Sequence, residues 1–287
     1  MDIALHDSTP FFISPIFIDN KKLKLPKTLT KQQLDAFTVG IIDGDGSLQV
    51  NHTVRRRSKI LQFRLVVKLA DKYLNYEMLC LLSKTYGGYV KQVKYKKYEY
   101  VQWVINDQKT FHRTILPLFT EYPPLTSRMR LQFEFFKKFM LNPDMELYFK
   151  ERPHKYVKRN NIIPLFSTLP TYFPEWLAGF IESEGSFNSR TKGNYSFSIA
   201  KNHDYYLIEA IRKFYSLQHL TILSKTGKIL RLRRGFPLYE FSVGSANGTG
   251  RVIDHCTPLL QGYKYYQLAL FVKNSKAFQD RVTELFF

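Results

Sequence analysis

Cysteine is scarce in this chain of 287 residues: Cys80 and Cys256 lie far apart and in no paired spacing. This argues against a disulfide framework or a zinc site and fits a reducing compartment. The apolar run at 11–18 is too short to span a bilayer and is broken by Pro15, so no membrane partner is expected. Since no arginine occurs before residue 55, the N-terminus resembles neither a secretory signal nor a transit peptide.

Acidic residues are also in short supply, with 24 Asp and Glu against 43 Lys and Arg, for a formal net charge of +19. A positive field of this size favours polyanions such as nucleic acid or anionic membrane, and the plainer alternative is a solvated basic surface. Hydrophobic residues make up 44% of the chain, which is enough for a core in one large domain or two ordinary ones.

The chain contains an internal duplication. Four segments of the first half match four of the second half in the same order, and the match that contains the acidic motif has an offset of 139. The matched pairs are 39–50 with 178–189, 67–74 with 200–207, 98–119 with 239–260, and 127–136 with 263–272. Four ordered matches indicate a repeat rather than coincidence.

Each half has the same predicted order of helix, two strands, helix, two strands and closing helices. Apolar periodicity predicts the first helix of each half at 31–43 and 174–182. Such a half forms an antiparallel sheet with helices on one face, an α+β fold. We expect repeats at 28–141 and 172–287, a linker at 142–171 that is rich in proline and basic residues, and an N-terminal arm at 1–27 without an assigned role.

The motif "IIDGDGS" at 41–47 matches "FIESEGS" at 180–186. An EF-hand loop requires glycine at position 6 and glutamate at position 12, which neither copy has. A hairpin turn explains the first copy but not the second, because "ESEG" is a poor turn sequence. The remaining interpretation is one site shared by the two copies.

Small residues four apart support the shared site: Gly40 with Gly44, and Gly179 with Ser183. Two helices with such pairs can pack with their backbones close together, although ordinary helix packing also explains this feature alone. The acids at the C-terminal ends of both helices then repel each other. A hard divalent cation such as Mg²⁺ relieves this repulsion, and Mn²⁺ or Ca²⁺ can substitute for it in binding.

The two motifs, "VGIIDGDGS" and "LAGFIESEGS", resemble the paired signature of the LAGLIDADG homing endonucleases in their monomeric, two-repeat form. The first copy departs from the family pattern at its start, where Thr38 and Val39 replace Leu and Ala. The resemblance covers roughly residues 30–280. It implies αββαββα repeats whose sheets form a DNA-binding saddle, and hydrolysis of both strands of a long asymmetric duplex across the minor groove, leaving 3′ overhangs.

The resemblance also implies the catalytic residues. The last acid of each motif, Asp45 and Glu184, is expected to bind the metals, with help from the carbonyls of Gly44 and Ser183. A basic residue before each closing helix is expected in the solvent network, which nominates Lys264 and Arg128. A polar residue after the second strand nominates Lys68 and Lys201, although their places in the strand alternation disagree unless one strand has a bulge.

Outward-facing strand positions are the expected DNA contacts. Arg, Gln and Asn read base edges, whereas Lys and Arg also bind phosphates. The candidates are Ser47, Gln49, Asn51, Gln62, Arg64, Lys94, Lys96, Ser186, Asn188, Arg190, Arg231 and Arg233.

Two other functions remain open: an intron-encoded maturase that binds its own intron RNA, and a basic structural protein bound nonspecifically to nucleic acid. The resemblance further implies a gene within an organelle intron, in the mitochondrion or else the chloroplast. The roles of Asp43 and Glu182 stay open between binding near the metals and ending the helix.

Overall fold

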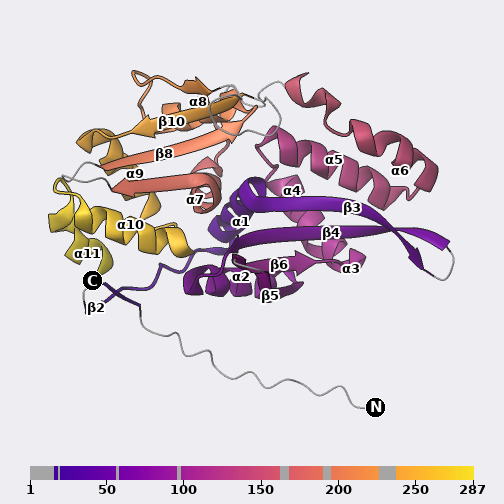
Figure 1. Cartoon of the computed structure of the whole chain (residues 1–287), viewed down its shortest axis with the longest axis horizontal. Helices are drawn as coiled ribbons and strands as arrows, with labels where there is room; N and C mark the ends of the chain where they lie inside the picture. Colours follow the sequence, from indigo (N-terminus) through magenta and orange to yellow (C-terminus); the bar gives the residue numbers. More distant parts are fainter. Residues whose placement is uncertain are drawn as a thin grey trace, which may run out of the picture.

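Two antiparallel four-stranded sheets with the same strand order form the body of the protein (Figure 1). The computed structural model describes residues 16–18, 20–55, 58–95, 98–161, 168–189, 195–225 and 237–287. The first sheet has the order β3-β4-β6-β5, with β3 (Gly46–Arg55), β4 (Ser58–Ala70), β5 (Tyr89–Tyr95) and β6 (Tyr98–Ile105). The second has the order β7-β8-β10-β9, with β7 (Gly185–Ser189), β8 (Tyr195–Asn202), β9 (Leu223–Lys225) and β10 (Leu238–Val243). The shared order confirms the predicted α+β fold of two pseudo-symmetric repeats.

Helices occupy matching places in both halves. The first half contains α1 (Lys31–Asp45), α2 (Tyr73–Tyr86), α3 (Gln108–Thr110), a π-helical turn (Phe111–Ile115), α4 (Leu116–Glu121) and α5 (Ser127–Leu141). The second contains α7 (Phe173–Glu184), α8 (Tyr205–Phe214), α9 (Ala246–Cys256), α10 (Tyr263–Asn274) and α11 (Val282–Phe286). A capping box starts α1, because the Thr30 and Gln33 side chains each accept a hydrogen bond from the other residue's backbone N–H.

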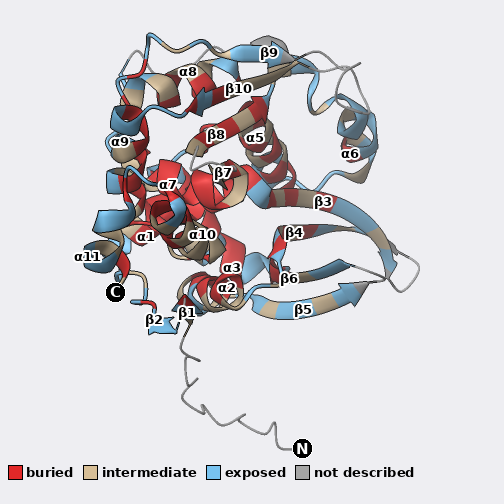
Figure 2. Cartoon of the chain, turned by 60° about the vertical axis from the view of Figure 1, so that its left-hand side comes forward, coloured by how far each residue is buried: buried red, intermediate tan, exposed pale blue. Residues whose placement is uncertain are grey.

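The strands bury one face and expose the other. Leu48 and Val50 of β3 are buried, whereas Ser47, Gln49 and Asn51 between them are partly or fully exposed. Side chains alternate across a strand, so this pattern leaves a polar face on the sheet. Figure 2 shows that buried residues gather on α1 and α7, between the two sheets.

The helices α1 and α7 touch backbone to backbone, as the paired small residues predict. A Cβ atom on Gly179 would lie 1.9 Å from the carbonyl oxygen of Phe37, and one on Gly40 would lie 2.0 Å from that of Trp176. Only glycine permits this approach. The contact brings the C-terminal ends of both helices together.

The segments outside the repeats also pack on them. Within the predicted linker, α6 (Met145–Glu151) buries Tyr148 completely, and its hydroxyl donates to the carbonyl of Val50 at 3.0 Å. The arm contains a hairpin of β1 (Phe17–Ile18) and β2 (Lys21–Lys22), and the N–H of Lys24 donates to the carbonyl of Phe286 at 2.8 Å. Throughout the described ranges, each helix is too short or too polar to cross a bilayer.

Candidate active site

Asp45 and Glu184 are the last residues of α1 and α7, and both side chains reach solvent at the seam. Desolvation of the Asp45 carboxyl by the surrounding protein, and then repulsion from Glu184, raise the pKa of Asp45 to about 6. Lys201, Arg128 and Lys264 lower it in part. The charges that act on Asp45 therefore come from both repeats, and five of the six predicted catalytic residues share one neighbourhood.

Lys201 is one of these five. It lies on β8 with 8% of its surface exposed, and its ammonium forms an ion pair with Glu184. The same Nζ atom lies 5.1 Å from the centre of the Phe180 ring. A buried cation in contact with a motif acid is placed to hold that carboxylate and to offset its charge.

Lys68 lies elsewhere. Its side chain is exposed on the outward face of β4, with Nζ 3.4 Å from the centre of the Tyr100 ring. Among the described residues, the charges that shift the pKa of Asp45 do not include Lys68. Gly46 pairs with Val67, and Gly185 pairs with Ile199. Lys201 lies two positions after Ile199, whereas Lys68 lies only one position after Val67. The predicted equivalence of the two lysines is therefore wrong, and the counterpart of Lys201 is the buried Leu69.

No bulge reconciles the two lysines within the described pairings. Residues 65–70 of β4 pair continuously with β6, and residues 197–202 of β8 pair continuously with β10. Because adjacent strand residues face opposite sides, a shift of one position moves a side chain from the core face to the outward face. The two halves of the site therefore differ in chemistry.

Arg128 binds the C-terminal end of α1. Its guanidinium donates to the carbonyls of Gly46 at 2.7 Å, Asp43 at 2.8 Å and Gly44 at 3.0 Å. These carbonyls form the negative end of the helix, where a cation is favourable. The Gly44 carbonyl predicted as a metal ligand thus already has a cationic partner.

Lys264 and Ser183 occupy different surroundings. Burial lowers the pKa of Lys264, while the carboxylates of Glu182 and Asp45 oppose this shift. The Ser183 hydroxyl donates across the seam to the carbonyl of Ile41 at 3.4 Å. This leaves the backbone carbonyl of Ser183 as its candidate metal ligand.

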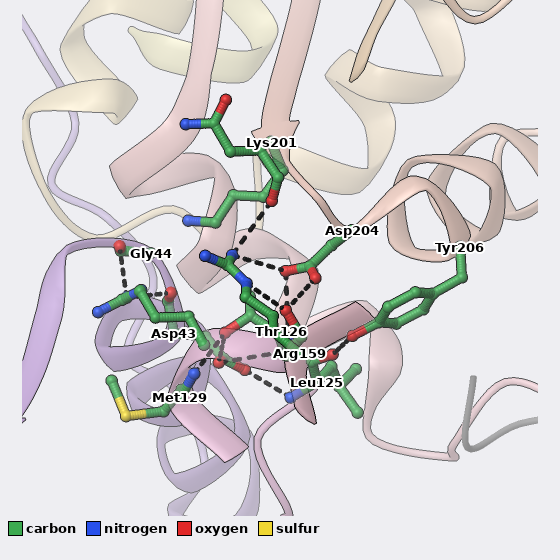
Figure 3. A network of polar contacts seen from close by, with 12 residues as sticks. Asp43, Gly44, Leu125, Thr126, Met129, Arg159, Lys201, Asp204 and Tyr206 are labelled. Carbon is green, nitrogen blue, oxygen red and sulfur yellow. Dashed lines mark hydrogen bonds and ion pairs between the residues drawn. The ribbon is translucent and has the colours of Figure 1, made fainter. Parts of the chain in front are cut away.

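The first acid of each motif has a role that sequence reasoning missed. Asp43 is fully buried and accepts hydrogen bonds from the N–H groups of Leu125 at 2.6 Å and Thr126 at 3.2 Å and from the Thr126 hydroxyl at 2.6 Å (Figure 3). The Trp176 indole donates to the same carboxylate at 2.8 Å. Burial raises the pKa of Asp43. Its carboxylate serves the start of α5, and neither of the two expected roles applies.

Glu182 does the same in the second repeat. It is buried and accepts hydrogen bonds from the N–H groups of Gln261 at 2.9 Å, Gly262 at 2.7 Å and Lys264 at 3.2 Å. Burial raises the pKa of Glu182 to about 7, against the effect of these hydrogen bonds. A signal for this role exists in the sequence, because the first amides of each closing helix have no partner within the helix and need acceptors from elsewhere.

The residues at the seam suit a hard divalent cation. The donors are the two carboxylates and nearby backbone carbonyls, and the described residues contain no group of three or more His, Cys, Asp or Glu that could hold an ion by themselves. Such an ion would complete its shell with water and phosphate, as Mg²⁺ commonly does. Burial, and then the neighbouring Glu184 carboxylate, raise the pKa of Asp45, and a bound cation would stabilise the charged form that both disfavour.

Known proteins match this chain in sequence. The LAGLIDADG endonuclease family model matches residues 38–140. The probable intron-encoded endonuclease aI3 of Debaryomyces hansenii is 34% identical over 278 residues, covering 84% of this chain and 38% of the relative. Its Dictyostelium citrinum namesake is 36% identical, covering 67% of this chain and 78% of that protein. The chain belongs to the LAGLIDADG endonuclease family.

Solved LAGLIDADG structures share its fold. I-SmaMI, bound to uncleaved DNA target in the presence of calcium ions, has a TM-score of 0.61 and 16% identity, covering 90% of this chain and 98% of that one. I-CpaMI, bound to uncleaved DNA, has a TM-score of 0.65 and 16% identity, covering 87% and 94%. At this identity the likeness shows the two-sheet architecture.

The outward faces of this LAGLIDADG chain present several of the predicted DNA contacts. Gln49 lies opposite Arg64, and Asn51 lies opposite Gln62. Ser47 and Ser186 lie near the starts of β3 and β7, and Asn188 lies on β7 opposite Ser196. Lys94 is exposed on β5, with an ion pair to Glu99 at 3.1 Å. The candidates Lys96, Arg190, Arg231 and Arg233 lie outside the described residues.

Proposed function

We propose that this LAGLIDADG protein is a site-specific endonuclease that hydrolyses one phosphodiester bond in each strand of an asymmetric DNA duplex, across the minor groove, leaving 3′ overhangs. The observation that carries the proposal is the meeting of Asp45 and Glu184 at the seam between two sheets with polar outward faces. Two acids from two repeats can serve the two strands of one duplex.

Asp45, Glu184 and the carbonyl of Ser183 would hold Mg²⁺ ions. Bound there, the ions would supply charge stabilisation at the phosphate and a more acidic water. Lys201 holds Glu184 in place through its ion pair. Lys264 and Arg128 place positive charge beside Asp45, where negative charge builds up during hydrolysis.

The sheet faces would hold the duplex. Paired Gln, Asn and Arg side chains on β3 and β4 can donate to and accept from base edges in the major groove. The excess of 43 basic over 24 acidic residues would supply phosphate contacts and a strong dependence of affinity on salt. Because the two sheets present different residues, we expect an asymmetric target bound by a single chain.

The test is selection of cleaved sites from a randomised duplex library with Mg²⁺. Asp45→Asn and Glu184→Gln should abolish cleavage of the selected duplex while binding measured in Ca²⁺ survives. Glu146→Gln, which removes an exposed acid on α6, is the matched control and should cut at the wild-type rate. Cleavage by Asp45→Asn or Glu184→Gln at the wild-type rate would show that the site is assigned wrongly.

We further propose that residues 28–141 and 172–287 are the two repeats, that 142–171 joins them, and that the gene lies within an organelle intron. The last point rests on the two relatives named probable intron-encoded endonuclease aI3. The formal net charge of +19 favours a polyanion of either kind, so a second candidate function is binding of the host intron RNA to assist splicing. A splicing assay with the Glu184→Gln protein separates the two functions, because RNA folding does not require the nuclease site.

A further inference from the structure

The closing helices α5 and α10 each carry a basic residue at the second position, Arg128 and Lys264. The first amides of a helix have no partner within the helix, so they need acceptors from elsewhere. Asp43 and Glu182 supply some of these acceptors from the motif of the same repeat. A second acceptor reaches each helix start from the opposite repeat.

At α5 this acceptor is Asp204, in the turn after β8 of the second repeat. One carboxylate oxygen accepts from the N–H of Ser127 at 3.2 Å, and the other accepts from the Ser127 hydroxyl. Asp204 is 1% exposed, and Arg159 joins it by donating to the Ser127 hydroxyl at 2.8 Å. Figure 3 shows Asp43 and Asp204 in one network with Arg159 at this helix start.

At α10 the acceptor is Asn75, from α2 of the first repeat. Its Oδ1 accepts from the N–H of Tyr263 at 2.9 Å, and its Nδ2 donates to the carbonyl of Ala70 at 3.0 Å. Asn75 is 6% exposed. The approach is close, because a Cβ on Gly262 would lie 2.8 Å from this oxygen.

Both contacts cross from one repeat to the other, although Asp204 lies at the N-cap of α8 and Asn75 in the first turn of α2. Asp204 and Asn75 both follow the second strand of their own repeat, and each accepts from the residue directly before Arg128 or Lys264 in the other. Both are buried polar side chains whose partners cannot be replaced by water without rearrangement. The position of each basic residue therefore depends on how the two repeats meet.

We propose that Asp204 and Asn75 are crossed positioning residues, each setting the basic residue that the opposite repeat brings to the shared site. Asp204 acts through Arg128, whose guanidinium in turn binds three carbonyls around the motif acid Asp45. Asn75 acts through Lys264. The catalytic part rests on the proposed nuclease function, whereas the positioning part concerns the free protein.

Hydrogen exchange on the full chain tests the positioning part without any cleavage. Asp204→Ala should raise exchange of the 126–129 amides about tenfold and leave 262–265 unchanged. Asn75→Ala should do the opposite, and it is the milder variant because it removes a neutral side chain. Asp204→Asn, which keeps one acceptor oxygen, should stay close to wild type. Loss of protection in the substituted residue's own repeat, or equally in both, would overturn the proposal.

Strand-resolved nicking of the selected duplex tests the catalytic part. Asp204→Ala and Asn75→Ala should shift the ratio of the two strand-cutting rates in opposite directions by about tenfold or more, while the Kd for DNA in Ca²⁺ stays within about twofold. A merely structural role would slow both strands equally, and that result rejects positioning. If the wild type cuts no selected duplex, the nuclease proposal fails, and the exchange pattern still decides the crossed contacts.

Discussion

Substitution of Gly179 by alanine tests whether backbone contact between α1 and α7 holds the site together. The new Cβ would lie 1.9 Å from the carbonyl oxygen of Phe37, in backbone that no rotamer change can move. Ordinary contact begins near 3.4 Å, so the helices would have to separate by roughly 1.5 Å. Overpacking of this kind costs about 3 kcal/mol or more in free energy of unfolding.

The same separation would move Asp45 away from Glu184, because each ends one of the two helices. A displacement of about an ångström at reacting groups lowers rates by roughly 100-fold. We therefore expect Gly179→Ala to lower both the free energy of unfolding, measured by chemical denaturation, and the cleavage rate of the selected duplex. Its DNA affinity should fall less, since the outward sheet faces lie away from the seam.

Gly250→Ala is the matched control, another glycine-to-alanine change within a helix. At Gly250 of α9 the nearest atom to a new Cβ is on the Phe278 ring at 3.7 Å, an ordinary contact. Alanine is the better helix former, so this variant should gain up to about 1 kcal/mol. A Gly179→Ala protein with wild-type stability and wild-type cleavage would refute the role given to the backbone contact.

Three further predictions concern pH and the seam. Burial lowers the pKa of His255 to about 4 from its ordinary 6.5. As the pH drops from 6.5 towards 4, this histidine is therefore protonated in the unfolded chain before it is protonated in the folded protein. The free energy of unfolding falls over this range by up to about 3 kcal/mol. Denaturation at pH 7 and pH 4.5 should show this component in wild type and not in His255→Gln; equal losses in both proteins would contradict it. Lys201 lowers the pKa of Asp45, so Lys201→Met should raise it further and move the acidic limb of the cleavage pH profile to higher pH. An unchanged acidic limb would show that Lys201 does not act on Asp45. Gly44→Ala places a Cβ 2.3 Å from the Ser183 side chain and should lower the free energy of unfolding. Adding Ser183→Gly should restore most of this loss, whereas additive losses in the double variant would show that the two positions are not in contact.

Local rules were sufficient for much of the fold. The helices predicted at 31–43 and 174–182 are confirmed as α1 and α7, because apolar periodicity depends on neighbouring residues. The structure also confirms that α1 and α7 pack at Gly40 and Gly179, since absence of a Cβ is visible in sequence. Placement of Asp45 and Glu184 follows from that contact.

The equivalence of Lys68 and Lys201 rested on the order of matched segments, although the strand alternation already placed the two lysines on opposite faces. Both lie near the ends of their strands, β4 and β8, and strand pairing places them one position apart. A shift of one residue reverses the face of a strand. The continuous pairing of residues 65–70 and 197–202 excludes a bulge there, so one lysine lies over Tyr100 and the other beside Glu184.

The sequence by itself determined the duplication, the two motif helices and the pair of acids at their ends, because each depends on residues close together in the chain or on a repeat that is visible by comparison. Tertiary structure alone decided what Asp43 and Glu182 hold, and it brought Asp204 and Asn75 to the closing helices of the opposite repeats. The backbone amides from which these four side chains accept lie 77 to 188 positions away along the chain. No local pattern records such contacts, since they exist only once the two sheets have folded and the repeats have met.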